Sequence, residues 1–488
     1  MTSSGKKIFG ILFGVLFAVA VLSGAFPAAA NTAGTDFSPE GDPLTYTVLS
    51  ENEMTAAVTG GESGLTSITI PSTVSYNGET YKVTEIAKNA FKGYTTITEL
   101  TFAPDSNLTA IREDAFAYIG PNNTAVPATI STLTFPASLE LVEDGAFHCI
   151  PVEHFALEAN SKLTAIPNGF LAAEGADGQP GIATECRSLW DYVHKILIEF
   201  SEPYPFTPKE VAEACACLKS IDLGENNSIG RIGDGAFKNQ VHLTDIDFGT
   251  STAELTIGHG AFIAMANNSY FVEQGIDSAL NAGIETLTLP ANLSEMGNGS
   301  FHYARVKNVV FSDNCKLETF GYSFMSIEGE DGMPGYGEDD GSSYGYNIQV
   351  PQYVIHAANC LETVRFGANN SLKEINSGAF KNQSHMTEID FGTPANELKI
   401  SYGAFTGVGN NGYLVELGID STLSAGIETL TFPANLKELC VGSFHYARIK
   451  NLVFSDNCKL GTIEHAFMTI DGEDGMPGYG KNDDTANY

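Results

Sequence analysis

The feature that most constrains the fold of this chain is a long internal repeat. The segment Ala-Phe-Lys-Asn-Gln that ends at Gln240 recurs 143 residues later at Gln383, and this offset holds without a gap over residues 208–340. A third, more divergent copy precedes these two. Repetition on this scale predicts a solenoid, because a single unit cannot bury its own apolar face and needs its neighbours to do so.

Each long copy contains four shorter units that share a phenylalanine after a small residue, usually alanine. Inside a unit, the alternating pattern of Ile130 to Phe135 predicts one short strand, and Leu-x-x-Ile, as in Leu108 to Ile111, predicts a second. We therefore predict a right-handed β-rich solenoid of about twelve or more units in three long copies, with one phenylalanine filling each coil. These phenylalanines are Phe91, Phe116, Phe147, Phe170, Phe237, Phe262, Phe301, Phe324, Phe380, Phe405, Phe444 and Phe467.

The repeat boundaries divide the chain into segments. An irregular insertion that holds Trp190 interrupts the array, and we expect a strand at 193–198 and a short helix at 209–218 within it. The expected segments are a signal peptide (1–30), a β lead-in (31–64), copy 1 (65–180), the irregular insertion (181–217), copy 2 (218–340), a linker (341–360), copy 3 (361–483) and a tail (484–488).

The first thirty residues have the three-part layout of a secretory signal peptide. Lys6 and Lys7 precede an uncharged apolar run that ends at Leu22, and small residues up to Ala30 offer a cleavage site before Asn31. The run is short for a membrane span, which needs about 20 apolar residues. We expect an exported chain that does not span the membrane after cleavage, with an uncleaved anchor as the alternative.

The composition is strongly acidic. Lys and Arg number 25 and Asp and Glu number 59, which gives a formal net charge of −34. Such a surface repels phosphate and therefore argues against nucleic-acid binding and against a polybasic membrane anchor. The hydrophobic fraction of 43% is too high for a disordered chain.

The repeat units resemble the BspA-like branch of the leucine-rich repeats. The stretch from Ile68 to Pro71, followed by Val83 to Ile86 and by Ala90-Phe91, carries the recurring pattern. The resemblance covers roughly residues 44–483. It implies a bacterial surface or secreted protein, with relatives in some protists, that binds host proteins or other cells.

The function expected from this resemblance is adhesion. The expected partner is a host matrix or cell-surface protein, or another cell, and the expected location is the cell surface or the medium. A structural spacer or matrix component without a specific ligand is the alternative. We expect no enzyme, because the sequence carries no GxSxG, Walker, HExxH or CxxC motif and a solenoid spreads its carboxylates instead of gathering them in one pocket.

Two paired insertions supply the candidate partner-binding residues. They occupy residues 263–283 and 406–426 and share an Ile-Asp-Ser segment. Their large side chains could act as exposed anchors for a partner. The alternative is that they cover the flank of the solenoid itself. The candidate anchors are Tyr270, Phe271, Tyr413 and Leu414.

Acidic glycine-rich loops supply the candidate metal ligands. Clustered carboxylates can bind Ca²⁺, but the EF-hand spacing fails, because Ile327 stands where the first acidic ligand belongs. A solvated turn is the alternative, and we expect no other cofactor. The candidate Ca²⁺ ligands are Asp177, Glu330, Asp331 and Asp474.

Histidine and cysteine recur with the long repeat. His148, His302 and His445 are expected at exposed corners about four units, or roughly 20 Å, apart, too far to share one metal ion. Cys315 and Cys458 share one repeat position and are too far apart for a mutual disulfide. We expect most of the eight cysteines to be free, buried thiols, with a disulfide framework as the alternative.

The last repeat poses a question about its end. The sequence stops at Tyr488, soon after copy 3, and contains no recognisable capping unit. Bare coils expose apolar surface and strand edges. We therefore expect residues 440–488 to be the least protected part of the array in hydrogen exchange.

Overall fold

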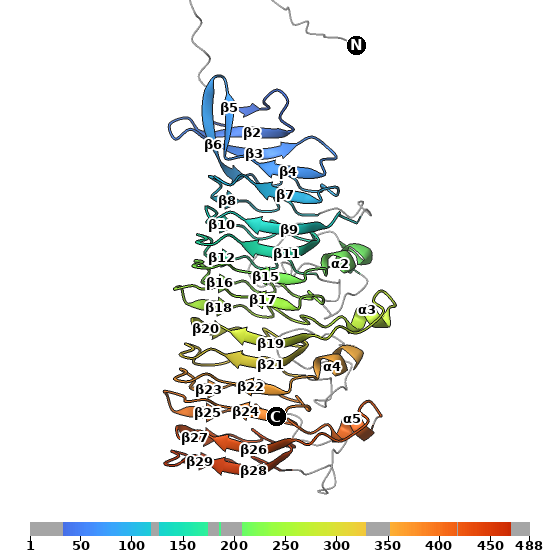
Figure 1. Ribbon diagram of the computed structural model, residues 1–488, viewed down its shortest axis with the longest axis vertical. Coiled ribbons are helices and arrows are strands. Elements are labelled where there is room, and N and C mark those ends of the chain that lie inside the picture. The colour runs from blue at the N-terminus through green and yellow to red at the C-terminus, as the bar shows by residue number, and fades with distance from the viewer. Residues whose placement is uncertain are drawn as a thin grey trace, which may run out of the picture.

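The computed structural model describes residues 33–118, 126–173, 185–186, 207–327, 352–416 and 418–469. These residues form an elongated stack of coils with two long columns of parallel strands, one on each side of the stack (Figure 1). Each coil contributes a longer strand to one column and a shorter strand to the other. The predicted solenoid of twelve phenylalanine-centred units is confirmed.

The first column contains the strands with the alternating apolar pattern. Leu133 in one coil aligns with Phe155 in the next, so the inward-facing residues of neighbouring coils stack in register. The strands are β4 (Ser67–Ile70), β7 (Glu99–Phe102), β9 (Ile130–Phe135), β11 (Val152–Leu157), β15 (Ser220–Asp222), β17 (Asp245–Asp247), β19 (Ile284–Leu289), β21 (Val306–Phe311), β22 (Thr363–Arg365), β24 (Glu388–Asp390), β26 (Ile427–Phe432) and β28 (Ile449–Phe454).

The second column contains the Leu-x-x-Ile strands. An isolated bridge between Thr319 and Glu374 continues it where the coil of Phe324 has no full strand. The strands are β3 (Thr55–Gly61), β6 (Glu79–Ile86), β8 (Ala110–Ile111), β10 (Leu141–Val142), β12 (Ala165–Ile166), β16 (Arg231–Ile232), β18 (Leu255–Ile257), β20 (Leu293–Met296), β23 (Glu374–Ile375), β25 (Leu398–Ile400), β27 (Leu436–Leu439) and β29 (Thr462–Ile463).

The N-terminal lead-in caps the stack. Strands β1 (Asp36–Phe37), β2 (Leu44–Ser50) and β3 pair antiparallel, and β5 (Thr73–Tyr76) pairs antiparallel with β6. Strand β3 also pairs in parallel with β6, which joins the cap to the second column. The first coil is therefore covered by paired strands and has no bare sheet edge on this side.

Four short helices and one small hairpin lie outside the two columns. The helices are α2 (Lys209–Cys215), α3 (Ser269–Glu273), α4 (Gln352–Ala358) and α5 (Gly412–Glu416), and all four protrude on the same side of the stack (Figure 1). The hairpin pairs β13 (Glu185–Cys186) with β14 (Thr207–Pro208). The predicted helix near 209–218 is confirmed as α2, whereas the strand predicted at 193–198 lies outside the described residues. Helix α4 lies within the stretch expected to be a linker.

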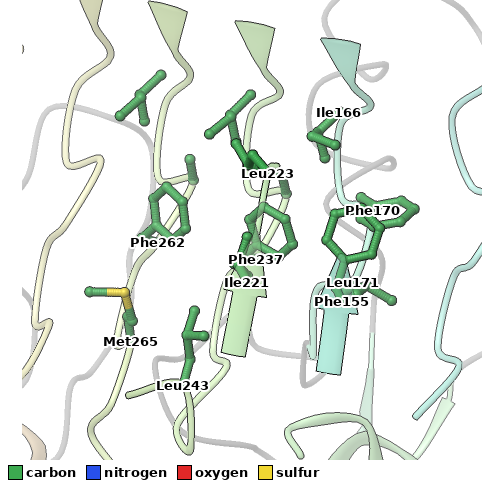
Figure 2. Close-up of a cluster of buried hydrophobic side chains, with 14 of the residues drawn as sticks. Phe155, Ile166, Phe170, Leu171, Ile221, Leu223, Phe237, Leu243, Phe262 and Met265 are labelled. Carbon is green, nitrogen blue, oxygen red and sulfur yellow. The ribbon is translucent and has the colours of Figure 1, made fainter. Parts of the chain in front are cut away.

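The Ala-Phe pairs form the core of the stack. The rings of Phe237 and Phe262 lie 5.4 Å apart and stacked, and those of Phe262 and Phe301 lie 4.9 Å apart. Figure 2 shows how the phenylalanines of successive coils line up among leucine and isoleucine side chains. The amide of Phe237 donates to the carbonyl of Ala261 in the next coil at 2.8 Å. Alanine precedes phenylalanine because the small side chain lets the two coils approach at this turn.

The histidines contradict the sequence-based expectation. His302 and His445 were expected at exposed corners, but they are only 7% and 6% exposed, and His148 is half-buried. The turn after phenylalanine packs against the next coil, so His302 meets the ring of Tyr303 at 3.8 Å and the hydroxyl of Ser326 at 3.1 Å. Burial lowers the pKa of His148.

The cysteines behave largely as predicted. Seven of the eight fall among the described residues, and all seven are free thiols, four buried and three half-buried. Cys217 and Cys360 donate to backbone carbonyls, and burial raises the pKa of each to about 11. They remain protonated at neutral pH and act as small apolar side chains.

The last described coil differs from the others in exposure. Strand β28 presents Leu452, Val453 and Phe454 with about two fifths of each side chain exposed, and Ile463 on β29 is 54% exposed. The equivalent strand of copy 2, β21, is mostly buried or half-buried. This contrast agrees in direction with the weak protection expected for residues 440–488, which stays a prediction.

Candidate binding surface

Two loop insertions carry the exposed aliphatic side chains that stand out most clearly on the array. We name residues 263–283 the first insertion and residues 406–426 the second insertion. Ile276 and Leu280 on the first insertion are 48% and 40% exposed, and Ile419 and Leu423 on the second are 41% and 54% exposed. The two pairs occupy equivalent positions of the 143-residue repeat.

The side chains proposed as anchors from the sequence are largely turned inward. Phe271 on α3 and Leu414 on α5 are each 2% exposed, so the expectation that they are exposed is wrong. Phe271 packs against the ring of His242 at 5.4 Å. Tyr270 is half-buried against the core, and Tyr413 lies on α5. The alternative reading, in which these residues cover the flank of the solenoid, holds for Phe271 and Leu414.

An asparagine fixes each insertion to itself. In the first insertion, the side-chain amide of Asn268 donates to Asp277 Oδ2 at 2.6 Å and to the Ala279 carbonyl at 3.2 Å, and its oxygen accepts from the Asn281 amide at 2.9 Å. This one side chain closes the loop across thirteen residues.

The second insertion repeats that arrangement. Asn411 donates to Asp420 Oδ2 at 2.7 Å and to the Thr422 carbonyl at 3.0 Å, and it accepts from the Ser424 amide at 2.6 Å. Two insertions whose sequences differ in several positions therefore keep the same hydrogen-bonded frame.

A histidine from the preceding coil also reaches each aspartate. His385 Nε2 lies 2.9 Å from Asp420 Oδ2, and His242 Nε2 lies 3.5 Å from Asp277 Oδ2. Burial lowers the pKa of His242, against the opposing effect of the Asp277 carboxylate. The aspartate of the shared Ile-Asp-Ser segment thus points inward to hold the loop, while its neighbours point outward.

The backbone turns of the two insertions match as well. The amides of Ile276 and Asp277 both donate to the Phe271 carbonyl, at 2.8 and 3.1 Å, and the second insertion repeats these bonds at Leu414. A left-handed glycine ends the short helix in each case, with φ of 70° at Gly275 and 72° at Gly418. Such helix ends favour glycine because it has no Cβ to strain the turn. The exposed aliphatic side chains therefore sit on a braced loop.

The sequence contained a signal for this surface. The Ile-Asp-Ser-x-Leu segment is shared by both insertions, and its isoleucine and leucine are the exposed pair. The larger neighbours on α3 and α5 attracted the prediction instead. Their burial follows from contacts with other coils, which a local sequence pattern does not reveal.

The acidic loops proposed as Ca²⁺ sites lie outside the described residues. This applies to Asp177, Glu330, Asp331 and Asp474. Among the residues that are described, Glu438, Cys440 and Glu464 bring three possible ligand atoms within 4.8 Å of one another. Burial raises the pKa of Cys440 to about 11, and the ammonium of Lys399 acts on the same thiol. A protonated thiol beside a cation is a weak metal ligand.

No described helix has the length and apolar character that a membrane span requires. The described part of the chain therefore meets other molecules through its coils and insertions.

Comparisons with known proteins agree on the repeat. The family model described as a BspA type leucine-rich repeat region, in six copies, matches residues 61–173, 207–327 and 349–469. No curated protein matches the sequence significantly.

Several solved structures resemble the chain at low sequence identity. The pneumococcal vaccine antigen PcpA is 17% identical, with 87% of this chain and 82% of that chain covered and a TM-score of 0.35. A leucine-rich repeat protein from Bacteroides ovatus is 16% identical, with 85% and 88% covered and a TM-score of 0.33. A leucine-rich cell surface protein from Faecalibacterium prausnitzii is 15% identical, with 89% and 100% covered and a TM-score of 0.30.

Proposed function

Because the chain belongs to the BspA-type leucine-rich-repeat family, we propose that it is an exported protein, secreted or held at the cell surface, that binds other proteins through the flank of its solenoid. The proposed partners are host matrix or cell-surface proteins, or proteins on another cell. The signal-peptide layout of the first thirty residues supports export.

The observation that carries the proposal is the pair of exposed aliphatic groups on each insertion. Exposed isoleucine and leucine gain nothing for folding where they stand, and clustered exposed apolar groups mark interaction sites. The hydrogen bonds of Asn268 and Asn411 hold both loops in one shape before any partner arrives. Binding to a pre-organised loop loses less conformational entropy than binding to a mobile one.

The test is to charge the four exposed aliphatic side chains at once. The variant combines I276D, L280D, I419D and L423D in the chain that starts at Asn31. We expect its affinity for immobilised matrix proteins or whole cells to fall at least tenfold, because buried aliphatic anchors would be replaced by solvated carboxylates. The measurement is surface plasmon resonance against a panel of matrix proteins, together with cell attachment.

The matched control is L141D, because Leu141 is also an exposed aliphatic residue, at 42%, but lies on β10. It should bind as the wild type does, and both variants should keep the wild-type circular dichroism spectrum and melting temperature. If the wild type binds a partner and the fourfold variant binds it equally well, the insertions are not the binding surface. If the folded wild type binds no partner at all, the spacer alternative gains.

A further inference from the structure

The two insertions form the same site twice on one rigid scaffold. They match in hydrogen-bonded frame, in glycine turn and in the exposed Ile/Leu pair. Between them the coils are joined by continuous pairing, from β18 to β20 in one column and from β21 through β22 to β24 in the other. The distance between the two insertions is therefore set by the fold.

That distance follows from the coil count. The first insertion follows the coil of Phe262 and the second follows the coil of Phe405, which is four coils later. At about 4.8 Å per coil, the two sites lie about 19 Å apart along the axis, on the same side of the stack (Figure 1). One partner molecule of ordinary size spans this distance easily.

The charges around the sites indicate the chemistry of the partner. Neither insertion contains a lysine or arginine, whereas each contains one glutamate and one aspartate. Glu273 and Glu416 are exposed beside the aliphatic pairs. A second copy of the chain would bring like charges together, with a net charge of −34 on each copy. A basic partner is complementary in charge.

We infer that the two insertions act together as a bivalent clamp for one protein partner that offers two aliphatic sites about 19 Å apart, each flanked by lysine or arginine. This inference rests on the proposed function and adds to it the number, spacing and charge of the contacts. When the first contact has formed, the second is intramolecular, so the joint affinity exceeds that of either site.

The experiment uses peptides as a defined probe. A random twelve-residue peptide display library is selected on the full chain and counter-selected on the fourfold variant I276D/L280D/I419D/L423D. The selected peptides should combine aliphatic residues with Lys or Arg, and two molecules should bind each chain. The pair I276D/L280D should leave one peptide bound per chain, as should the pair I419D/L423D.

Tandem peptides then test the clamp. Two copies of the selected peptide are joined by Gly/Ser linkers of different lengths. A linker of about 12 residues has a root-mean-square span of about 19 Å, whereas one of three residues reaches only about 10 Å. We expect the longer tandem to bind the wild type at least 100-fold tighter than the single peptide. The short tandem and either single-insertion variant should show no such gain.

The outcomes separate the two proposals. If no selected peptide distinguishes the wild type from the fourfold variant, the proposed binding surface is wrong. If single peptides bind both insertions but no linker length improves affinity, the surface stands and the clamp is wrong. If the selected peptides are acidic, or if the wild type dimerises through these side chains in light scattering and the fourfold variant does not, the inferred partner is wrong.

Discussion

At the residue scale, the coils demand very small side chains at particular turns. The amides of Gly224 and Gly249 accept the same role in successive coils, each donating at 2.8 Å to the aspartate two residues before it. A Cβ on Gly249 would overlap the carbonyl oxygen of Gly224. Gly275, in the first insertion, has a similar left-handed φ but open space around it.

These two glycines give a matched pair of substitutions. We expect G275A to lower the free energy of unfolding by about 1–2 kcal/mol, the usual cost of a left-handed alanine. G249A should cost clearly more, because the coil must also move away from its neighbour. Thermal unfolding of both variants, followed by circular dichroism, makes the comparison. Equal losses would show that close coil contact does not require glycine at position 249.

The residue pattern also shows how far the sequence determines the core. Phenylalanine after alanine recurs with the coil period, and Phe237 and Phe262 are fully buried as predicted. The period works because every coil repeats the same surroundings. His302 and Phe271 were misplaced because their burial depends on groups from other coils, Tyr303 with Ser326 and His242 respectively.

At the element scale, the insertions depend on one asparagine each. Asn268 and Asn411 are almost fully buried, and each makes three hydrogen bonds within its loop. Removing these bonds leaves backbone groups without partners, which costs about 1–3 kcal/mol where they are buried. The loop then samples open conformations more often, while the coils beneath keep their own pairing.

We therefore expect N268A to speed amide exchange of residues 276–282 about tenfold or more and to leave β19 unchanged. The corresponding effect of N411A falls on residues 419–425. Hydrogen exchange followed by mass spectrometry resolves these segments, and S278A, at an exposed position, serves as the control. Unchanged exchange in N268A would mean that the side-chain bonds do not brace the loop.

Helix α4 illustrates what the element pattern alone does not reveal. Its residues fall in the stretch expected to be a linker, yet Val354 and Ile355 are buried with Tyr303 in a small separate cluster. Helix α4 also contacts α3 of the first insertion. The sequence of α4 has no partner in the repeat pattern that would announce this packing.

At the scale of the whole molecule, the solenoid converts sequence repetition into spatial repetition. Copies 2 and 3 are nearly identical in sequence, so their insertions recur at a fixed offset along the stack. The solenoid class and the unit count followed from the sequence because stacking is nearest-neighbour in nature. Which of the side chains on an insertion face solvent required the three-dimensional packing.

The most direct test of the central claim is a hydrogen-exchange footprint of the full chain, alone and saturated with the matrix protein that binds it most tightly. The account predicts slower exchange at residues 273–282 and 416–425 together, with the solvent-facing strands of both columns unchanged. Protection confined to strands of the two columns, with both insertions exchanging as in the free chain, would contradict it.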